Sequence, residues 1–187
     1  MSLYHYIASN HPLPIGERGG RKSPLDKSGL VPPKAFHFLS NDNSYVLFPG
    51  DFSSSISEDE IEVYETMEDA AGIIIYELVQ GDEMIRKHFK LPYVYGIVPN
   101  WGKFYFNQEM KKIFPEEYWA CVKCVSVLFD LMRDINDDQS VFELYSCWIG
   151  EETQESNSDL ATCIRLSTFK LGDHFELKER QYISIVK

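Results

Sequence analysis

Residues 115–135 read PEEYWACVKCVSVLFDLMRDI. Pro115 suits the first position of a helix, and Glu116 and Glu117 follow it in the first turn, where carboxylates favour the helix dipole. Apolar side chains then recur at helical spacing, and the predicted buried stripe is Tyr118, Val122, Val125, Phe129 and Met132. We therefore predict an amphipathic helix over about 116–135 that packs against other elements.

A second helix is predicted over about 67–80. Thr66 is a suitable N-cap, and Gly81 suits the position after the last turn. The apolar residues at core spacing between them are Met67, Ala70, Ala71, Ile74 and Leu78. Asp82 is in turn expected to cap a short helix that runs through His88.

The remaining segments favour β-structure. β-prone runs bounded by turn residues predict a strand at 3–8, a hairpin formed by 35–39 and 44–48, a strand at 61–65, an aromatic hairpin over 93–106 that turns at 99–102, and strands beginning at about 141, 161 and 174. Gly172-Asp173 predicts a tight antiparallel hairpin between the last two strands. These patterns predict a single α+β domain over 1–187, with a mixed, mainly antiparallel sheet that ends in a three-strand meander and is packed by two main helices.

The net charge of −11 is concentrated in one part of the chain. The 51 residues between Lys34 and Arg86 contain no Lys or Arg and twelve Asp or Glu. The preceding residues 10–34 are basic and contain five of the nine prolines and four of the eleven glycines, which predicts an irregular loop within the domain. Two interpretations of the acidic block are open: an ordinary solvated surface, or a docking surface for a basic partner.

Composition excludes several classes of protein. An acidic chain lacks the basic face of a nucleic-acid-binding protein. No apolar run is long enough to cross a bilayer, and the first residues lack a charged-then-apolar leader, so we expect a cytoplasmic protein with no membrane contact. We predict no cofactor, and the oligomeric state is not predicted.

The cysteines and histidines do not form a recognisable metal motif. Cys121 and Cys124 make a C-x-x-C, but it lies inside the predicted long helix, and we expect buried free thiols rather than a redox or zinc site. Cys147 and Cys163 are expected in strands. The five histidines are widely spaced along the chain, and no metal site is predicted.

Two weaker signals concern ligands. Residues 16–23 read GERGGRKS, in which glycines and the cations Arg18, Arg21 and Lys22 supply the ingredients of an anion site. The same stretch lacks the G-K-[ST] ending of a P-loop, so a flexible basic loop is the competing interpretation.

Glu179 is the unusual residue of the last strand. In an unbroken strand it would share the apolar face, and a buried carboxylate is a functional candidate; a bulge or turn at Glu179-Arg180 would instead expose it. Tyr4-His5-Tyr6, the strand-to-helix step at 63–66 and Glu179-x-Gln181 resemble NAD-dependent ADP-ribosyltransferases. That resemblance implies that His5 binds a nicotinamide ribose and that Glu179 stabilises an oxocarbenium-like transition state, although the family has Glu where Gln181 stands.

Two hypotheses about function follow. The first is a non-catalytic protein-binding module, of inhibitor, immunity or adaptor type, that binds a basic protein partner. Its predicted contact residues are Glu58, Asp59, Glu60, Glu62, Tyr93, Tyr95 and Trp101. The alternative is an enzyme acting on a nucleotide-like cofactor, with His5 and Glu179 as catalytic residues and Arg18 or Arg21 near phosphate.

Overall fold

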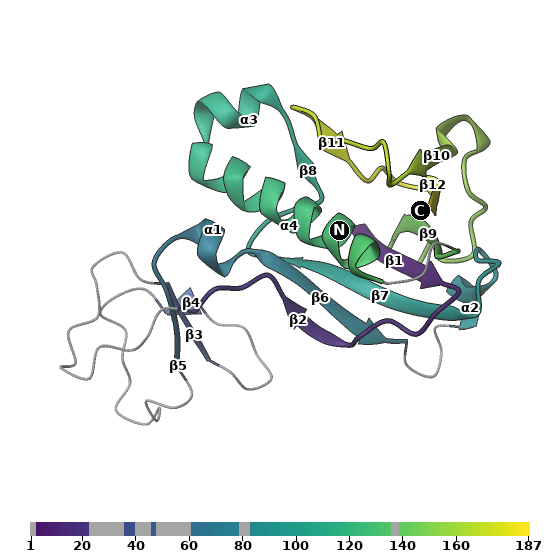
Figure 1. Cartoon of the computed structure of the whole chain (residues 1–187), viewed down its shortest axis with the longest axis horizontal. Helices are drawn as coiled ribbons and strands as arrows, with labels where there is room; N and C mark the ends of the chain where they lie inside the picture. Colours follow the sequence, from purple (N-terminus) through teal and green to yellow (C-terminus); the bar gives the residue numbers. More distant parts are fainter. Residues whose placement is uncertain (1–2, 23–35, 40–45, 48–60, 79–82, 136–138) are drawn as a thin grey trace.

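A seven-stranded sheet is the framework of the protein (Figure 1). The computed structural model describes residues 3–22, 36–39, 46–47, 61–78, 83–135 and 139–187. The strands in spatial order are β10 (Thr162–Arg165), β12 (Tyr182–Val186), β9 (Val141–Trp148), β1 (Leu3–Ser9), β7 (Tyr93–Asn100), β6 (Gly72–Glu77) and β2 (Gly16–Arg18). Every neighbouring pair is antiparallel except β10 and β12, which are parallel. The predicted α+β class and mixed sheet are therefore confirmed.

The strand β1 lies at the centre of this sheet. Ile7 is opposite Tyr95 of β7 on one side and Leu144 of β9 on the other. Tyr-His-Tyr-Ile is rich in aromatic and β-branched residues, which fit a pleated surface covered on both faces. The strand predicted at 3–8 is thus confirmed, and it is the middle strand of the seven.

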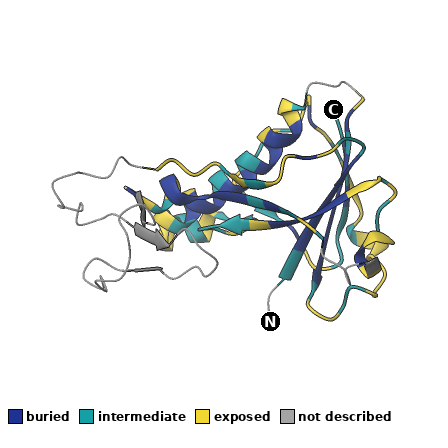
Figure 2. Cartoon of the chain, turned by 90° about the horizontal axis from the view of Figure 1, so that it is seen from below, coloured by how far each residue is buried: buried dark blue, intermediate teal, exposed yellow. Residues whose placement is uncertain are grey.

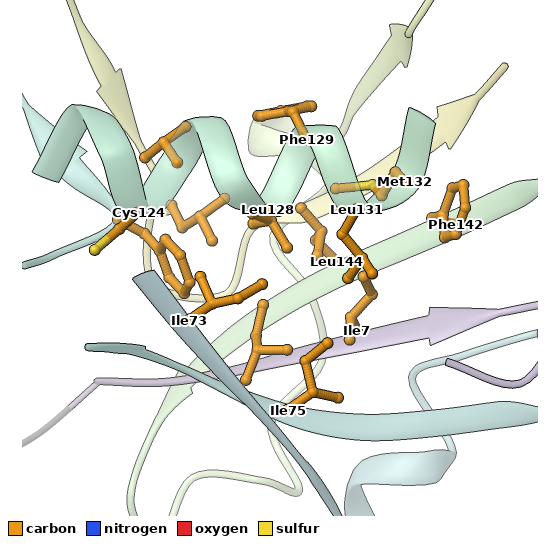
Figure 3. Close-up of a cluster of buried hydrophobic side chains, with 14 of the residues drawn as sticks. Ile7, Ile73, Ile75, Cys124, Leu128, Phe129, Leu131, Met132, Phe142 and Leu144 are labelled. Atoms are coloured by element: carbon orange, nitrogen blue, oxygen red, sulfur yellow. The ribbon is translucent and has the colours of Figure 1, made fainter. Parts of the chain in front are cut away.

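The helix α4 (Pro115–Asp134) covers one face of the sheet, and it confirms the helix predicted at 116–135. Its core-facing side chains, including Leu128, Leu131 and Met132, lie against Ile7, Ile73 and other residues of the strands (Figure 3), whereas Phe129 lies on the side of α4 away from these strands. Phe129 is also in contact with Phe169 and Phe175 from the C-terminal segment. Full burial of such a side chain contributes about 1.5–3 kcal/mol, so this cluster is the main apolar core of the fold.

The opposite face of the sheet carries a much smaller cluster of Tyr6, Ile85, Tyr145 and Cys147. The helix α2 (Glu83–Arg86) contributes Ile85; the predicted short helix is present, but it ends at Arg86 and not at His88, and its predicted cap Asp82 lies outside the described residues. This face also contains a buried carboxylate. Glu143 accepts hydrogen bonds from the backbone N–H groups of Lys90 and Leu91. Its contacts attach the segment that follows α2 to the sheet.

The loop after β9 is attached to the same region through its backbone. Four successive carbonyl groups, those of residues 152–155, each accept a hydrogen bond from a side chain of another segment. His88 donates to Glu152 at 2.7 Å, Lys87 to Thr153 at 2.8 Å, Tyr145 to Gln154 at 3.0 Å and Arg180 to Glu155 at 2.8 Å. The His88 ring also stacks on Tyr145, with ring centroids 4.2 Å apart. This loop therefore has a defined path over the outer face of the sheet.

The helix predicted at 67–80 is wrong beyond its first turn. Thr66 does cap α1 (Met67–Ala70), accepting from the backbone N–H of Asp69, but the chain then enters β6. At Gly72 the chain passes so close to β2 that a Cβ would lie 1.9 Å from the carbonyl oxygen of Arg18. Three consecutive isoleucines follow, and β-branched residues favour a strand over a helix.

The C-terminal meander and the aromatic hairpin are also corrected. After Arg165 the chain turns out of the sheet, since the N–H groups of Thr168 and Phe169 both bond to the Arg165 carbonyl. The packing of Phe169 and Phe175 on α4 holds it there, so it returns as β12 in the same direction as β10. On this excursion β11 (Phe175–Glu176) pairs with β8 (Tyr105–Phe106), which is therefore not the hairpin partner of β7.

The other described elements are short. β3 (Phe36–Leu39), β4 (Val46–Leu47) and β5 (Ile61–Tyr64) form an antiparallel sheet in the order β4-β3-β5, which confirms the predicted hairpin and the strand at 61–65. A turn of 3-10 helix, η2 (Ser158–Leu160), precedes β10. In the described part of the chain, no helix combines the length and the hydropathy of a membrane-spanning segment.

Candidate functional site

Two helices meet at a sharp bend at one end of the molecule. The helix α3 (Gln108–Ile113) is capped by Asn107, whose side chain accepts from the N–H of Met110 at 2.8 Å. A single residue, Phe114, separates it from α4, which begins with Pro115. Proline has no N–H and restricts the residue before it, so α3 ends and a new helix axis begins. Figure 1 shows α3 and the start of α4 projecting away from the sheet.

The bend exposes three large apolar side chains. Ile113 is 56% exposed, Phe114 is 57% exposed and Trp119, one turn into α4, is 44% exposed. We call these three residues the apolar corner. The other exposed large hydrophobic side chains among the described residues are Ile15, Met84, Ile149 and, five residues apart on β7, Tyr93 and Val98. Single exposed hydrophobic residues are ordinary on protein surfaces, whereas three at one bend form a candidate interaction site.

The aromatic part of the apolar corner is supported from below. The Trp119 ring packs edge-on against Tyr118, at 5.0 Å, and Tyr118 is itself buried against Phe106 of β8, at 5.5 Å. Lys111 of α3 holds its ammonium group 5.3 Å from the Trp119 ring centre and 5.4 Å from that of Tyr118. These contacts orient the indole in advance, which lowers the entropy that a partner must overcome.

A short ion pair ties the base of the same corner to the loop after β7. Lys103 donates to Glu117 of α4 at 2.7 Å, and this hydrogen bond raises the pKa of the lysine. The corner thus combines exposed apolar area and aromatic faces with a lysine over the rings and an ion pair at its base.

The sequence predictions for the protein-binding surface have mixed outcomes. Glu58, Asp59 and Glu60 lie outside the described residues, and Glu62 lies on β5 opposite Phe38 in the strand register. Of the predicted aromatic contacts only Tyr93 is exposed, at 41%.

Two of those aromatic residues belong to the interior instead. Tyr95 is buried, and its hydroxyl accepts from the N–H of Leu13 at 3.1 Å. Trp101 is partly buried against the main core and has a φ of 56°. Tyr95 lies on β7 and faces the main core together with Ile97, whereas Trp101 is the first residue after β7.

The predicted anion-site residues lie near carboxylates. Arg21 is 2.6 Å from Asp69, and Lys123 of α4 donates to the carbonyls of Glu68 and Asp69. A pocket of about 510 Å³ is lined by Gly19, Arg21, Thr66, Glu68, Asp69 and Lys123. Burial lowers the pKa of Lys123. The contact of Arg21 attaches the segment after β2 to α1, and the contacts of Lys123 attach α1 to α4.

Arg18 and Lys22 are placed differently from Arg21. Arg18 lies on β2, opposite Ile73 of β6, and its backbone is the close neighbour of Gly72. Lys22 is exposed, at the end of the first described stretch of the chain. An anion-binding role for the three cations stays a prediction.

His5 and Glu179 are not brought together. His5 is buried, its Nδ1 lies 2.7 Å from the Ser146 hydroxyl, and its ring meets Phe104 edge-on. Burial lowers the pKa of His5 to about 4, so the ring is neutral at pH 7.

Glu179 is exposed in a turn, which confirms the turn interpretation. The turn is closed by the N–H of Gln181, which donates to the Lys178 carbonyl, and Arg180 has a φ of 56°. Burial raises the pKa of Tyr145 to about 12, and Glu179 makes a smaller contribution. The N–H of Arg180 donates to the carbonyl of Ser146, and among the described residues no hydrogen bond or ion pair joins Glu179 to His5. The catalytic role proposed for the two residues stays a prediction, without a shared site to support it.

The two thiols of the C-x-x-C, Cys121 and Cys124, are buried and free, as predicted. Burial raises the pKa of Cys124 to about 12. Cys147 is also buried, whereas Cys163 on β10 is exposed. Among the described residues no group of three or more His, Cys, Asp or Glu side chains is placed to hold a metal ion.

Comparisons with known proteins add no relative. No protein-family model, no curated protein and no solved structure matches this chain.

Proposed function

We propose that this protein is a non-catalytic binding module for a basic protein partner and that the apolar corner at the α3–α4 bend is its principal contact. The observation that carries the proposal is the joint exposure of Ile113, Phe114 and Trp119 on a supported bend. Aromatic side chains of this kind dominate the binding energy of many protein interfaces.

The energetics of the apolar corner favour a partner that surrounds it. Each of its three side chains has about half of its surface left to bury, which corresponds to about 1 kcal/mol or more apiece. Together they offer roughly 300–400 Å², less than the ~800 Å² per partner of a standard interface. The corner alone is too small for a stable dimer of this chain, and the partner needs further contacts.

Charge supports a basic partner. The chain carries a net charge of −11, so two copies repel each other whereas a cationic protein is attracted over a distance of about a Debye length. Such attraction raises the association rate more than it lowers the dissociation rate. Replacing Glu58, Asp59, Glu60 and Glu62 with Gln and Asn is therefore expected to slow association with little change in dissociation.

The test compares two matched double variants as baits. Phe114→Ser with Trp119→Ser removes two side chains of the apolar corner, and Ile15→Ser with Ile149→Ser removes two equally exposed side chains elsewhere. Immobilised wild type and control are expected to retain the same basic protein from a lysate of the source cells. The corner variant is expected to bind that protein, once purified, at least about tenfold more weakly, because two contact residues of more than 1 kcal/mol are lost.

The measurement is isothermal titration calorimetry with the purified partner, after circular dichroism has shown that all three baits are folded. Equal affinity of the corner variant and the wild type would contradict the proposal. A captured partner that is acidic, or whose association rate does not depend on salt, would contradict the electrostatic part.

A further inference from the structure

The strand β10 forms one open edge of the seven-stranded sheet. It pairs with β12 on one side, and within the described residues no strand pairs with its other side (Figure 1). Thr162, Cys163 and Arg165 are exposed, and Ile164 packs partly against the main core. The edge is therefore available to another extended chain.

The direction of the backbone groups follows from the contacts of the next residues. The N–H of Leu166 donates to the Val186 carbonyl of β12 at 2.8 Å. Because successive residues of a strand point their backbone groups to opposite sides, residues 162 and 164 also face β12, whereas Cys163 and Arg165 face outward. The Arg165 carbonyl agrees with this, since it accepts from the turn that leaves the sheet. The N–H and C=O of Cys163 and the N–H of Arg165 thus lie along the open edge.

Proteins usually protect such edges with charges, proline or a covering segment. β10 contains no proline, and its single charge is Arg165 at the C-terminal end. The exposed side chains at its N-terminal end are uncharged. This half of the edge therefore carries neither a charge nor a proline, although the strand itself is short.

Negative charge lies next to the N-terminal end of the edge. The residues from Gly150 to Ile164 include four Asp or Glu and no Lys or Arg. Asp159 is exposed and three residues before Thr162, and Glu155 is exposed with its carbonyl bound to Arg180, two residues before β12. The Arg180 side chain places one cation beside Glu155, which leaves an excess of acidic groups near the N-terminal end of β10, with Arg165 at the other end.

We propose that the open edge of β10 binds an extended segment of the protein partner by strand addition, with the basic residues of that segment next to Glu155 and Asp159. Backbone hydrogen bonds to Cys163 and Arg165 supply the pairing, and the acidic end selects a cationic segment. The segment runs antiparallel to β10, the more stable arrangement, so its basic residues are at its C-terminal end. The inference rests on the proposed protein-binding function and specifies a second contact for it.

The test uses a synthetic peptide rather than the partner. The probe is Thr-Val-Thr-Val-Thr-Lys-Lys, acetylated and amidated, and the readout is amide hydrogen exchange of the full-length protein by NMR. We expect the amides of Cys163 and Arg165 to exchange about tenfold more slowly at a free peptide concentration ten times its Kd. A peptide that ends in Glu-Glu is expected to bind more weakly, with an affinity difference that shrinks in high salt.

Two controls separate strand pairing from simple charge attraction. Cys163→Pro removes only an outward N–H and is expected to weaken peptide binding about three- to tenfold, the effect of one hydrogen bond, whereas Cys163→Val is expected to bind as the wild type does. The probe with N-methylated valines keeps its charges but cannot pair, and it is expected to lose the protection at Cys163 on the unaltered protein.

Several results would overturn the inference. The first is that the N-methylated probe binds as tightly as the parent peptide. The second is that the exchange rates of the Cys163 and Arg165 amides do not change when the peptide binds. The third is that these amides become protected as the protein concentration rises without peptide, which would assign the edge to a second copy of the chain. The corner variant with Phe114→Ser and Trp119→Ser is expected to bind the peptide normally. Failure of the peptide test and failure of the corner test are thus distinguishable.

Discussion

The two faces of the seven-stranded sheet are covered in different ways (Figures 1 and 2). On one face the long helix α4 packs a large apolar cluster against β1, β6, β7 and β9. On the other face a four-residue cluster is surrounded by hydrogen bonds to particular atoms, such as those from Lys90 and Leu91 to Glu143. The helix-covered face depends on apolar area, and the outer face depends on the position of individual donors and acceptors.

This difference teaches where the fold is tolerant of change. An apolar cluster loses stability in proportion to the volume removed, and it accepts other side chains of similar size. A buried carboxylate loses most when its partners are left without an acceptor. Substitutions on the two faces should therefore differ in the cause of the lost stability as well as in its magnitude.

The largest effect is expected in the helix-covered core. Phe129→Ala should lower the free energy of unfolding by about 3–5 kcal/mol, because it leaves a cavity between α4 and two other phenylalanines. Phe114→Ala, on the exposed bend of the same helix, should change it by less than about 0.5 kcal/mol. Urea denaturation of the two variants measures the difference, and equal losses would contradict the assignment of core and surface.

The next effect concerns the one histidine buried on the helix-covered face. The pKa of His5 is about 4, below the ordinary value of 6.5, because burial disfavours the charged ring. Below pH 6.5 the unfolded chain takes up a proton that the folded protein does not bind until about pH 4, so acid favours unfolding. The free energy of unfolding should fall by about 3 kcal/mol between pH 7 and pH 4 on account of this residue.

His5→Gln isolates that contribution from the protonation of carboxylates. Gln can still bond to Ser146, and it does not titrate. The stability difference between wild type and variant should therefore shift by about 3 kcal/mol in favour of the variant from pH 7 to pH 4. A constant difference, measured by urea denaturation at each pH, would show that His5 is protonated equally in both states.

The smallest effect is expected on the outer face. Glu143→Leu should lower the free energy of unfolding by about 2 kcal/mol, because the N–H groups of Lys90 and Leu91 lose their acceptor. Glu143→Gln should cost less, since its amide oxygen can still accept. Amide exchange at residues 90 and 91 should accelerate in the Leu variant and not in the Gln variant. An equal response of the two variants would indicate a purely steric role.

The sequence predicts the elements that depend on local pattern. The helix α4 has a proline at its first position and an apolar stripe, and the structure buries the predicted residues except for the half-buried Val122. Thr66 is correctly identified as a cap, but a cap does not determine the length of the helix that follows it. The decisive residues there are Gly72 and three isoleucines, whose preference for a strand is satisfied by pairing with β2 and β7.

Pairings between distant segments are not predictable from local pattern. Gly172-Asp173 is a plausible hairpin turn, yet β11 pairs with β8, about seventy residues earlier, because Phe175 packs on Phe106 and Phe129. The same limit applies to His5 and Glu179. Glu179 lies in a turn in which Arg180 has a φ of 56°, and local pattern does not show where that turn lies relative to His5.

The apolar corner was missed for a different reason. Ile113, Phe114 and Trp119 are large and hydrophobic, and such residues are assigned to the core when only the sequence is known. One local signal was present: Ile-Phe directly before Pro115 falls outside the helical stripe and has no strand pattern around it. Exposure itself follows from the angle between α3 and α4, which the sequence does not show.

The four bound carbonyls of residues 152–155 have a consequence for how this surface can vary. Each of these four anchors is a main-chain oxygen, and each donor is a side chain from outside the loop. The carboxylate of Glu152 also accepts from the N–H of Gly150, so the anchors of Thr153 and Gln154 are the ones that place no demand on the side chain. New side chains can be grafted onto these two positions with the anchors kept, which makes this part of the loop a natural place for diversification, in evolution or in a designed library.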